Sequence, residues 1–208
     1  MLEKIKTKPA LSDSSPLHSE AIKQGKQFFI DAQKFNVIDA FKPLTVETIK
    51  SKLAETAFPF AVCMENWIGD LNFGSFIRNA NAFNVKEIFY VGAKRFDRRG
   101  AQGTYHYKDV VFLPNIEDLK DLKRKYRFIG IDNIPGSVSL TNYSWFKNSR
   151  RDLPPLLIFG EEGCGLTTGM QYLCEEIVHI DMYGSVRSLN AATASGIIMH
   201  SVTSQIVI

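Results

Sequence analysis

From about residue 57 onward, short apolar runs alternate with segments whose apolar residues have a helical spacing. The runs, such as residues 60–64 and 156–159, are almost continuously apolar. Strands of this kind are typical of a parallel sheet, because crossover helices bury both of its faces. The pattern therefore predicts an α/β fold with a parallel sheet that is covered by helices on both faces.

Ligands of such sheets bind beyond the carboxyl ends of the strands, so the loops at that edge are the candidates for function. These loops span residues 66–75, 93–104, 160–167 and 181–189. The expected strands cover residues 60–64, 87–92, 109–113, 128–132, 156–159 and 176–180, and the expected helices cover residues 75–83, 116–125, 168–175 and 189–205.

Residues 1–56 lack this alternation. Residues 1–20 are polar and contain a serine cluster, which predicts a flexible lead-in, while residues 19–36 and 45–53 have a helical spacing of apolar residues. We therefore predict a short helical N-terminal extension over residues 1–56 and an α/β domain over residues 57–208.

The composition is that of an ordinary globular chain, since 45% of the 208 residues are hydrophobic and 23% are charged. No apolar stretch approaches the roughly 20 residues that cross a bilayer, so no membrane segment is expected. The three cysteines form no CxxC pair, and they are too few for a disulfide framework. We expect reduced cysteines, a cytoplasmic location and no metal site.

The formal net charge is only +3, but the basic residues are clustered. Clusters occur over residues 94–99, 120–127 and 147–151. Three such clusters in one small domain favour a polyanionic partner such as a nucleic acid.

The loop over residues 160–167 follows a buried strand and contains Gly160, Gly163 and Gly165. Glycines at this place let a backbone approach a ligand closely. Together with the later Asp181, the loop imitates a dinucleotide site, but its G-x-x-G-x-G spacing differs from the G-x-G-x-x-G of Rossmann folds. A Rossmann-type nucleotide-dependent enzyme is therefore a weaker alternative.

Two further segments carry candidate residues. Residues 181–190 lead into a helix that opens with small residues, and we expect Ser188 to be its N-cap. Residues 72–83 contain the helix expected over residues 75–83, which has one buried face and has Arg78 on another side. We place Arg78 near the first turn, where the helix dipole favours anions, so an arginine there is a candidate for binding a phosphate.

In order and spacing, these segments resemble the three motifs of the SpoU (TrmH-like) family of the SPOUT superfamily, which are S-adenosylmethionine-dependent RNA 2′-O-ribose methyltransferases. Residues 72–83 resemble the first motif, residues 158–166 the second and residues 180–190 the third. The resemblance spans about residues 57–205, and three motifs in order are highly specific. It departs from the family at Asp181, where the family usually has proline.

The resemblance implies a SPOUT fold with a deep C-terminal trefoil knot and a homodimer with the active site between subunits. It also implies methyl transfer from S-adenosylmethionine to a ribose 2′-hydroxyl in structured RNA, and we favour tRNA over rRNA because the chain is compact. The matching cofactor positions are Gly160, Ile180 and Leu189, with Glu161, Gly165 and Met182 as further candidates.

The implied catalytic residues are Arg78, Asn72, Glu162, Ser188 and Asn190. A guanidinium has a pKa above about 12, so we expect Arg78 to clamp a phosphate and to stabilise charge on the 2′-oxygen rather than to act as an ordinary base. The loop with Arg95, Arg98 and Arg99 is expected to bind RNA, because it combines basic residues with an aromatic residue.

A catalytically inactive SPOUT-like RNA-binding protein is the second alternative. The presence of all the polar motif residues argues against it. No histidine lies within the motifs, so a histidine base is not indicated, and we expect His106 and His179 to be surface or core residues.

Overall fold

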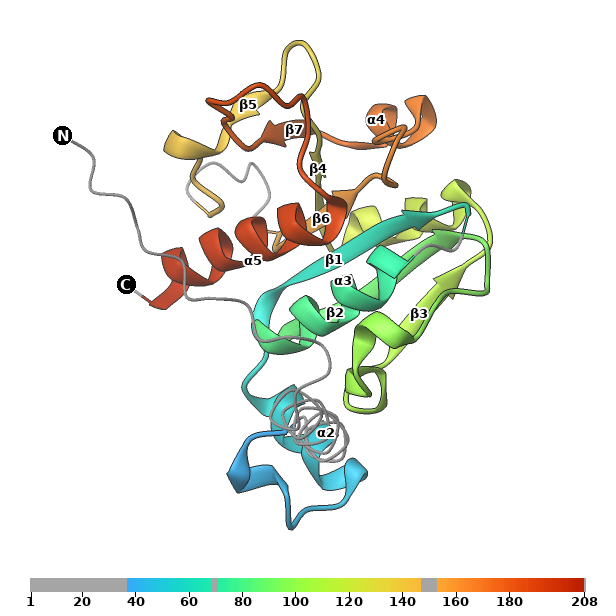
Figure 1. The fold of residues 1–208 in the computed structure, drawn as a ribbon, viewed down its shortest axis with the longest axis vertical. Helices are drawn as coiled ribbons and strands as arrows, with labels where there is room; N and C mark the ends of the chain where they lie inside the picture. The colour runs from blue at the N-terminus through green and yellow to red at the C-terminus, as the bar shows by residue number, and fades with distance from the viewer. Residues whose placement is uncertain (1–36, 69–70, 147–152, 208) are drawn as a thin grey trace, which may run out of the picture. The chain divides into compact units, whose positions relative to one another are not determined.

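Residues Pro43–Ile208 form one compact unit. Of the other unit, Met1–Lys42, the structure describes the short 3-10 helix η1 (Asp39–Phe41). The expected helix over residues 19–36 and the basic cluster over residues 147–151 lie outside the described residues. In this computed structural model the described residues, coloured in Figure 1, are 37–68, 71–146 and 153–207.

The strands form one parallel sheet, which confirms the predicted sheet type. They are β1 (Phe58–Asn66), β2 (Val85–Gly92), β3 (Val110–Leu113), β4 (Arg127–Ile131), β5 (Val138–Ser139), β6 (Pro155–Phe159) and β7 (Glu176–His179). Their order is β3-β2-β1-β6-β4-β7-β5, so the carboxyl ends of β6, β4 and β7 are neighbours. The two-residue strand β5 was not expected, because it is too short to show a periodic pattern.

Helices cover both faces of the sheet, as the apolar strands predict. They are α2 (Val46–Glu55), α3 (Leu71–Ala82), α4 (Thr168–Leu173) and α5 (Ala191–Val207), with 3-10 helices η2 (Arg99–Ala101), η3 (Thr104–His106), η4 (Ile116–Arg124) and η5 (Leu140–Asn142). Phe60 of β1 belongs to a core with α3 and α5, which lie side by side in Figure 1. Its neighbour Ala61 faces the opposite core, with η4 and α4. Among the described helices, none is both long and apolar enough to cross a membrane.

Helix α2 belongs to the same compact unit as the sheet. Thr45 caps it by accepting a hydrogen bond from the Thr48 backbone N–H at 3.3 Å. Asn84, which precedes β2, donates from Nδ2 to the Leu53 carbonyl (3.1 Å) and to the Thr56 hydroxyl (3.0 Å), and so ties the end of α2 to the sheet. The division of the chain at residues 56 and 57 stays a prediction.

Two expectations about helices were wrong, and a third helix is present with a tighter winding than the α-helix. Helix α3 begins at Leu71, so Arg78 is its eighth residue, and the helix dipole argument does not apply because the dipole acts on the first turn. The expected helix at residues 116–125 is the 3-10 helix η4. Asn190 and not Ser188 caps α5, since Asn190 Oδ1 accepts the backbone N–H groups of Ala192 (3.0 Å) and Thr193 (3.2 Å).

The small residues at the start of α5 allow close contact with α3. Asn79 of α3 donates from Nδ2 to the Ala192 carbonyl (2.8 Å) and to the Ser195 hydroxyl (3.0 Å). Ser195 is fully buried, and a Cβ on Gly196 would lie 3.4 Å from the Asn79 amide. This contact brings the first and third motif segments together.

Gly160 is required by the loop that follows β6. Glu161 and Gly165 pair as an antiparallel bridge, which folds the loop back on itself. A Cβ on Gly160 would lie 2.1 Å from the Gly165 carbonyl carbon and 2.3 Å from the Leu166 nitrogen, both backbone atoms. The space beside Gly160 is therefore filled by the loop's own backbone, and not kept open for a ligand.

Gly160→Ala should destabilise the protein strongly, because backbone atoms would have to move to admit the methyl group. Gly169→Ala is the matched control, since its Cβ would meet only Ile116 Cδ1 at 3.4 Å, an ordinary contact. Removing a helical glycine should stabilise the protein by up to about 0.5–1 kcal/mol. Thermal unfolding of both variants tests this, and equal melting temperatures would contradict the close approach at Gly160.

Candidate functional site

A pocket of about 310 Å³ lies at the carboxyl ends of β4, β6 and β7, where the expected ligand loops meet. The loop after β6, the loop after β7 and the start of α5 line most of it. Its lining residues are Ile131, Asp132, Asn133, Ile134, Phe159, Gly160, Glu161, Glu162, Gly163, Cys164, Gly165, Gln171, His179, Ile180, Met182, Arg187, Ser188, Leu189, Ala191 and Ala194.

The six residues that the sequence suggests for the cofactor all line this pocket. Gly160, Glu161 and Gly165 come from the loop after β6. Ile180, Met182 and Leu189 come from the loop after β7. The structure thus brings them to one place, and their role in binding stays a prediction.

The third wall of the pocket, which was not predicted, consists of Ile131 at the end of β4 and residues 132–134 after it. Asp132 Oδ2 accepts the Leu166 backbone N–H at 2.8 Å, and Asn133 Nδ2 donates to the Arg187 carbonyl at 3.2 Å. Asp132 therefore holds the loop after β6, while Asn133 holds the loop after β7. The signal was a polar Asp-Asn pair directly after an apolar strand.

Asp181, where the family usually has proline, anchors the loop after β7. Its Oδ2 accepts hydrogen bonds from the hydroxyls of Ser139 (2.5 Å) and Thr141 (2.6 Å). These bonds lower the pKa of the Asp181 carboxyl. His179, which was expected to be a surface or core residue, lines the pocket; its Nε2 lies 3.5 Å from Asp181 Oδ1 and its Nδ1 2.9 Å from the Ser137 hydroxyl.

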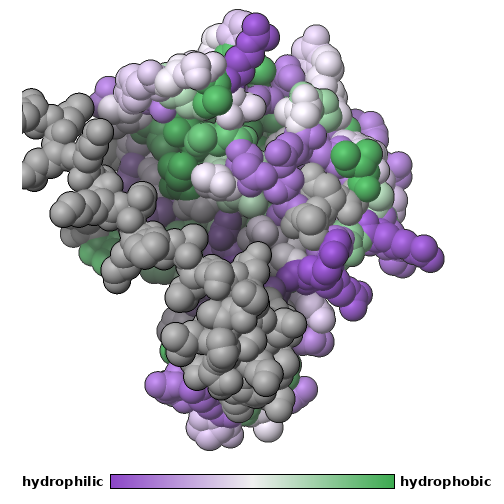
Figure 2. Space-filling view, in the orientation of Figure 1, coloured by the Kyte–Doolittle hydropathy of each residue, from purple (hydrophilic) through white to green (hydrophobic). Residues whose placement is uncertain are grey.

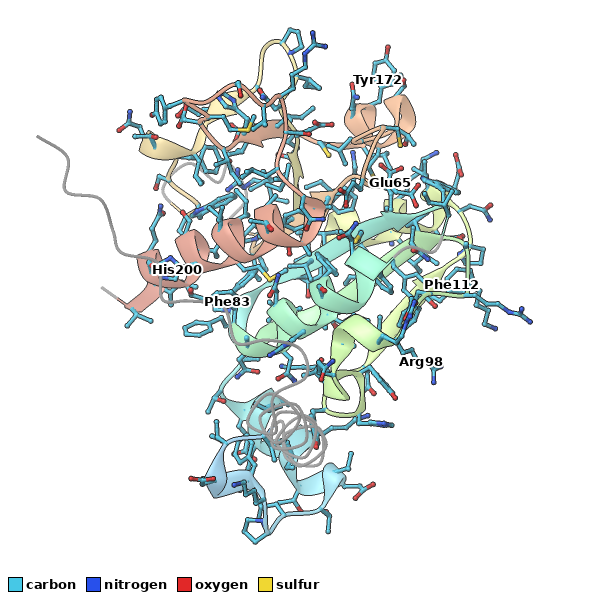
Figure 3. All side chains as sticks on the ribbon, in the orientation of Figure 1. Glu65, Phe83, Arg98, Phe112, Tyr172 and His200 are labelled. Atoms are coloured by element: carbon cyan, nitrogen blue, oxygen red, sulfur yellow. The ribbon has the colours of Figure 1, made fainter. Side chains whose placement is uncertain are left out.

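Buried carboxylates also hold the loop after β6 to the end of β1. Glu65 is 1% exposed, and it accepts the Thr167 backbone N–H at 2.9 Å and the Thr167 hydroxyl at 2.6 Å. Glu161 Oε1 accepts the Ile68 backbone N–H at 2.8 Å. Figure 3 shows Glu65 on the ribbon of β1, on the side of α4. One edge of the pocket is therefore fixed from β1.

One side chain from each motif segment meets in a polar cluster formed by Asn72, Glu162 and Asn190. Asn190 Nδ2 donates to Asn72 Oδ1 and to Glu162 Oε2, both at 2.8 Å, and Asn72 Nδ2 donates to the same carboxylate oxygen. Because Asn190 Oδ1 is engaged in capping α5, its amide nitrogen must face the cluster. Glu162 and Asn190 are exposed, so a substrate can reach the cluster.

The other two suggested catalytic residues lie apart from the cluster. Ser188 is exposed and lines the pocket. Arg78 is exposed on α3 and does not line the pocket, and among the described residues none forms a hydrogen bond or an ion pair with it. Arg78 is thus available to a partner or substrate, but the chain does not bring it to its own pocket.

The basic loop, residues 93–99, packs along the first turns of α3. A Cβ on Gly74 would lie 2.7 Å from the Asp97 carbonyl, so no larger residue fits there. Arg95, Arg98 and Arg99 are all exposed. The Arg99 guanidinium pairs with Asp97 at 2.6 Å and lowers the pKa of that carboxyl, so Arg95 and Arg98 are better placed for phosphates.

Not every basic residue faces solvent. Arg127, from the cluster at residues 120–127, is 5% exposed and pairs with Glu176 at 3.3 Å. It also donates to the Trp145 carbonyl at 2.8 Å. Arg127 is therefore a structural residue.

Over the described ranges, no group of three or more histidine, cysteine or acidic side chains could hold a metal ion.

Known proteins are similar to this chain. A model described as the SpoU rRNA Methylase family matches residues 59–200. The 23S rRNA (guanosine-2′-O-)-methyltransferase RlmB of Haemophilus influenzae is 24% identical over 174 residues, which are 81% of this chain and 69% of RlmB.

Solved structures are similar as well. AviRb of Streptomyces viridochromogenes, a SpoU methyltransferase solved in complex with the cofactor AdoMet, has a TM-score of 0.62 and 25% identity over 71% of this chain and 60% of AviRb. The A. aeolicus TrmH/SpoU tRNA modifying enzyme has a TM-score of 0.65 and 23% identity, over 78% of this chain and 84% of that chain.

Three curated bacterial relatives match this chain over 58% to 69% of their own length. The family match includes most of β1, all of β2, β6 and β7, the polar cluster, and the pocket loops after β6 and β7. It also covers more than half of the 208 residues. The chain therefore belongs to the SpoU rRNA Methylase family.

Proposed function

We propose that this protein is an S-adenosylmethionine-dependent methyltransferase acting on a ribose 2′-hydroxyl in structured RNA. The observation that carries the proposal is the position of Glu162, which both lines the pocket and accepts hydrogen bonds in the polar cluster. A methyl donor in the pocket and a hydroxyl at the cluster would then be neighbours. The names of the relatives and the bound cofactor of AviRb support this assignment.

The pocket suits the proposed cofactor. Its volume of about 310 Å³ is at the lower end of the ~300–1,000 Å³ of ligand sites. Ile131, Ile180 and Leu189 offer apolar contact to a flat base, and backbone groups around Gly160 and Gly165 can pair with its polar edge. The acidic side chains in the lining suit ribose hydroxyls and a cationic donor. S-adenosylmethionine would supply an activated methyl group there.

The residues of the chain would act on the hydroxyl. Asn72, Glu162 and Asn190 form a preorganised set of donors and acceptors that can orient the ribose without moving. Arg78 would clamp the neighbouring phosphate with its planar guanidinium and stabilise the negative charge that develops on the 2′-oxygen. Ser188, at the pocket, would hydrogen-bond to the ribose or to Arg78.

We further propose two properties of the assembly. The chain would form the deep trefoil knot of the SPOUT fold, and two copies would form a homodimer with each site between subunits. The exposed Arg78 supports the dimer, because a second copy can bring it to the pocket. Exposed apolar surface also supports the dimer, because a second copy would cover it. Ile197 and Val207 of α5 are 39% and 72% exposed. Figure 2 shows hydrophobic residues at the surface between α5 and strands β5 and β7.

The RNA would be tRNA, with rRNA as the alternative. A relative named as an rRNA methyltransferase and a solved structure named as a tRNA modifying enzyme are both similar to this chain, so similarity does not choose between the two substrates. Methyl incorporation into separated tRNA and rRNA fractions decides between them. Arg95 and Arg98 would contact the phosphates, because they are exposed and their loop lies along the first turns of α3.

S-adenosylmethionine, or its demethylated product, should raise the melting temperature by roughly 5–10 °C at about 100 times its Kd. Ala194→Phe should abolish this shift by filling the pocket. Thr193→Phe should keep it, because Thr193 is exposed on the same turn and does not line the pocket. A similar shift with NADH would instead support a Rossmann-type site, and no shift with any of these ligands would contradict the cofactor assignment.

Arg78→Lys should lower methylation by on the order of 10²-fold, because lysine keeps the charge but loses the planar pair of donors. Binding of S-adenosylmethionine should be unchanged. Arg124→Lys, an exposed arginine on η4, is the control and should methylate normally. Single-turnover methylation at saturating RNA measures both variants. A wild-type rate for Arg78→Lys would remove Arg78 from the mechanism.

Light scattering should report a particle of about twice the chain mass of 23.5 kDa. If each site lies between subunits, mixed dimers of Arg78→Lys and Glu162→Gln chains should recover activity that neither variant has alone. Recovery is expected because one of the two sites would then combine an intact Arg78 with an intact Glu162. A fully active monomer would contradict the dimer.

A further inference from the structure

Trp67 follows β1 and is 40% exposed. It does not line the pocket and is not among the residues suggested by the family motifs. Its ring is nevertheless held in place. Trp67 Nε1 donates to Glu65 Oε1 at 3.2 Å, and a Cβ on Gly92 would lie 2.9 Å from the ring atom Cε3. The ring therefore packs on Gly92 with one part left open to solvent.

Hydrogen bonds locate Trp67 between the basic loop and the pocket. On one side, the preceding Asn66 donates from Nδ2 to the carbonyls of Ala93 (2.8 Å) and Arg95 (3.2 Å) at the start of the basic loop. On the other side, the following Ile68 donates its backbone N–H to Glu161, which lines the pocket. The residues on both sides of Trp67 are thus fixed, one to the basic loop and the other to a pocket residue, so an RNA strand that runs along this edge of the sheet from Arg95 to the pocket would pass the exposed part of the ring.

We propose that Trp67 is a stacking platform for an unpaired base of the RNA substrate, next to the nucleotide that is methylated. Unpaired bases stack on exposed aromatic rings, and RNA-binding surfaces combine such rings with basic residues. A ring with a fixed orientation loses little entropy on binding. The inference rests on the proposed function, because it requires RNA at this edge of the sheet.

Tryptophan fluorescence tests the proposal directly, since the chain has only two tryptophans. Trp145 is fully buried, and its Nε1 donates to the Ser201 hydroxyl, so added RNA cannot reach it. Bulk tRNA and deproteinised ribosomal RNA are the probes, and the fraction that accepts methyl groups should quench Trp67. A long blunt-ended RNA duplex is the control and should bind through its phosphates with little quenching. In Trp67→Phe the quenching should disappear.

Affinity measurements give the second readout. Trp67→Ala should weaken binding of the methylated RNA by about 5- to 150-fold, the range found when a base loses its aromatic partner. Trp67→Phe should keep most of the affinity, because it keeps a ring. The affinity for S-adenosylmethionine should be unchanged in both variants, which separates loss of stacking from damage to the loop that Glu65 also holds.

Four results would overturn the proposal. Wild-type RNA affinity in Trp67→Ala, or unchanged emission with an RNA that is methylated, would remove Trp67 from the RNA site while the proposed function stands. Emission that acrylamide cannot quench before RNA is added would mean that a second copy of the chain covers the ring. If neither RNA fraction is methylated and S-adenosylmethionine does not bind, the proposed function and this inference fail together.

Discussion

Carboxylates that accept backbone N–H groups hold the loop after β6, and the pocket depends on them. Glu65 binds Thr167, Asp132 binds Leu166 and Glu161 binds Ile68, so the loop is tied to the ends of β1 and β4. A glycine-rich loop loses much conformational entropy when it is ordered, and charge-assisted hydrogen bonds offset that loss. Removing one of these carboxylates would leave the N–H groups that it accepts without a partner, which is destabilising.

The same anchors connect the pocket with the end of β1 and with the polar cluster. Glu65 accepts hydrogen bonds from Thr167 at the end of the pocket loop and from Trp67 on the side of the basic loop. Glu162, in the loop after the neighbouring strand β6, also connects two regions, because it lines the pocket and accepts hydrogen bonds in the polar cluster. A donor in the pocket and an RNA strand at the sheet edge would therefore be held by one connected set of side chains.

Asp181 restrains the loop after β7 through side-chain hydrogen bonds. Proline, which the family usually has at this position, restricts the backbone through its fixed φ. Here the carboxylate of Asp181 accepts hydrogen bonds from Ser139 and Thr141, so the loop after β7 is fastened to the segment around β5. The substitution therefore keeps the loop anchored, because side-chain hydrogen bonds take over from ring geometry.

The parallel α/β sheet, the approximate bounds of most strands and two of the three pocket loops follow from the sequence alone, because burial on both faces and glycine placement leave local signals in the chain. Three features emerge only from the folded chain: Asn190 caps α5 while bonding to Asn72 and Glu162, Asp132 forms a wall of the pocket, and Arg78 lies outside it. These features depend on contacts between residues far apart in the chain, and such contacts leave no periodic trace in a single sequence.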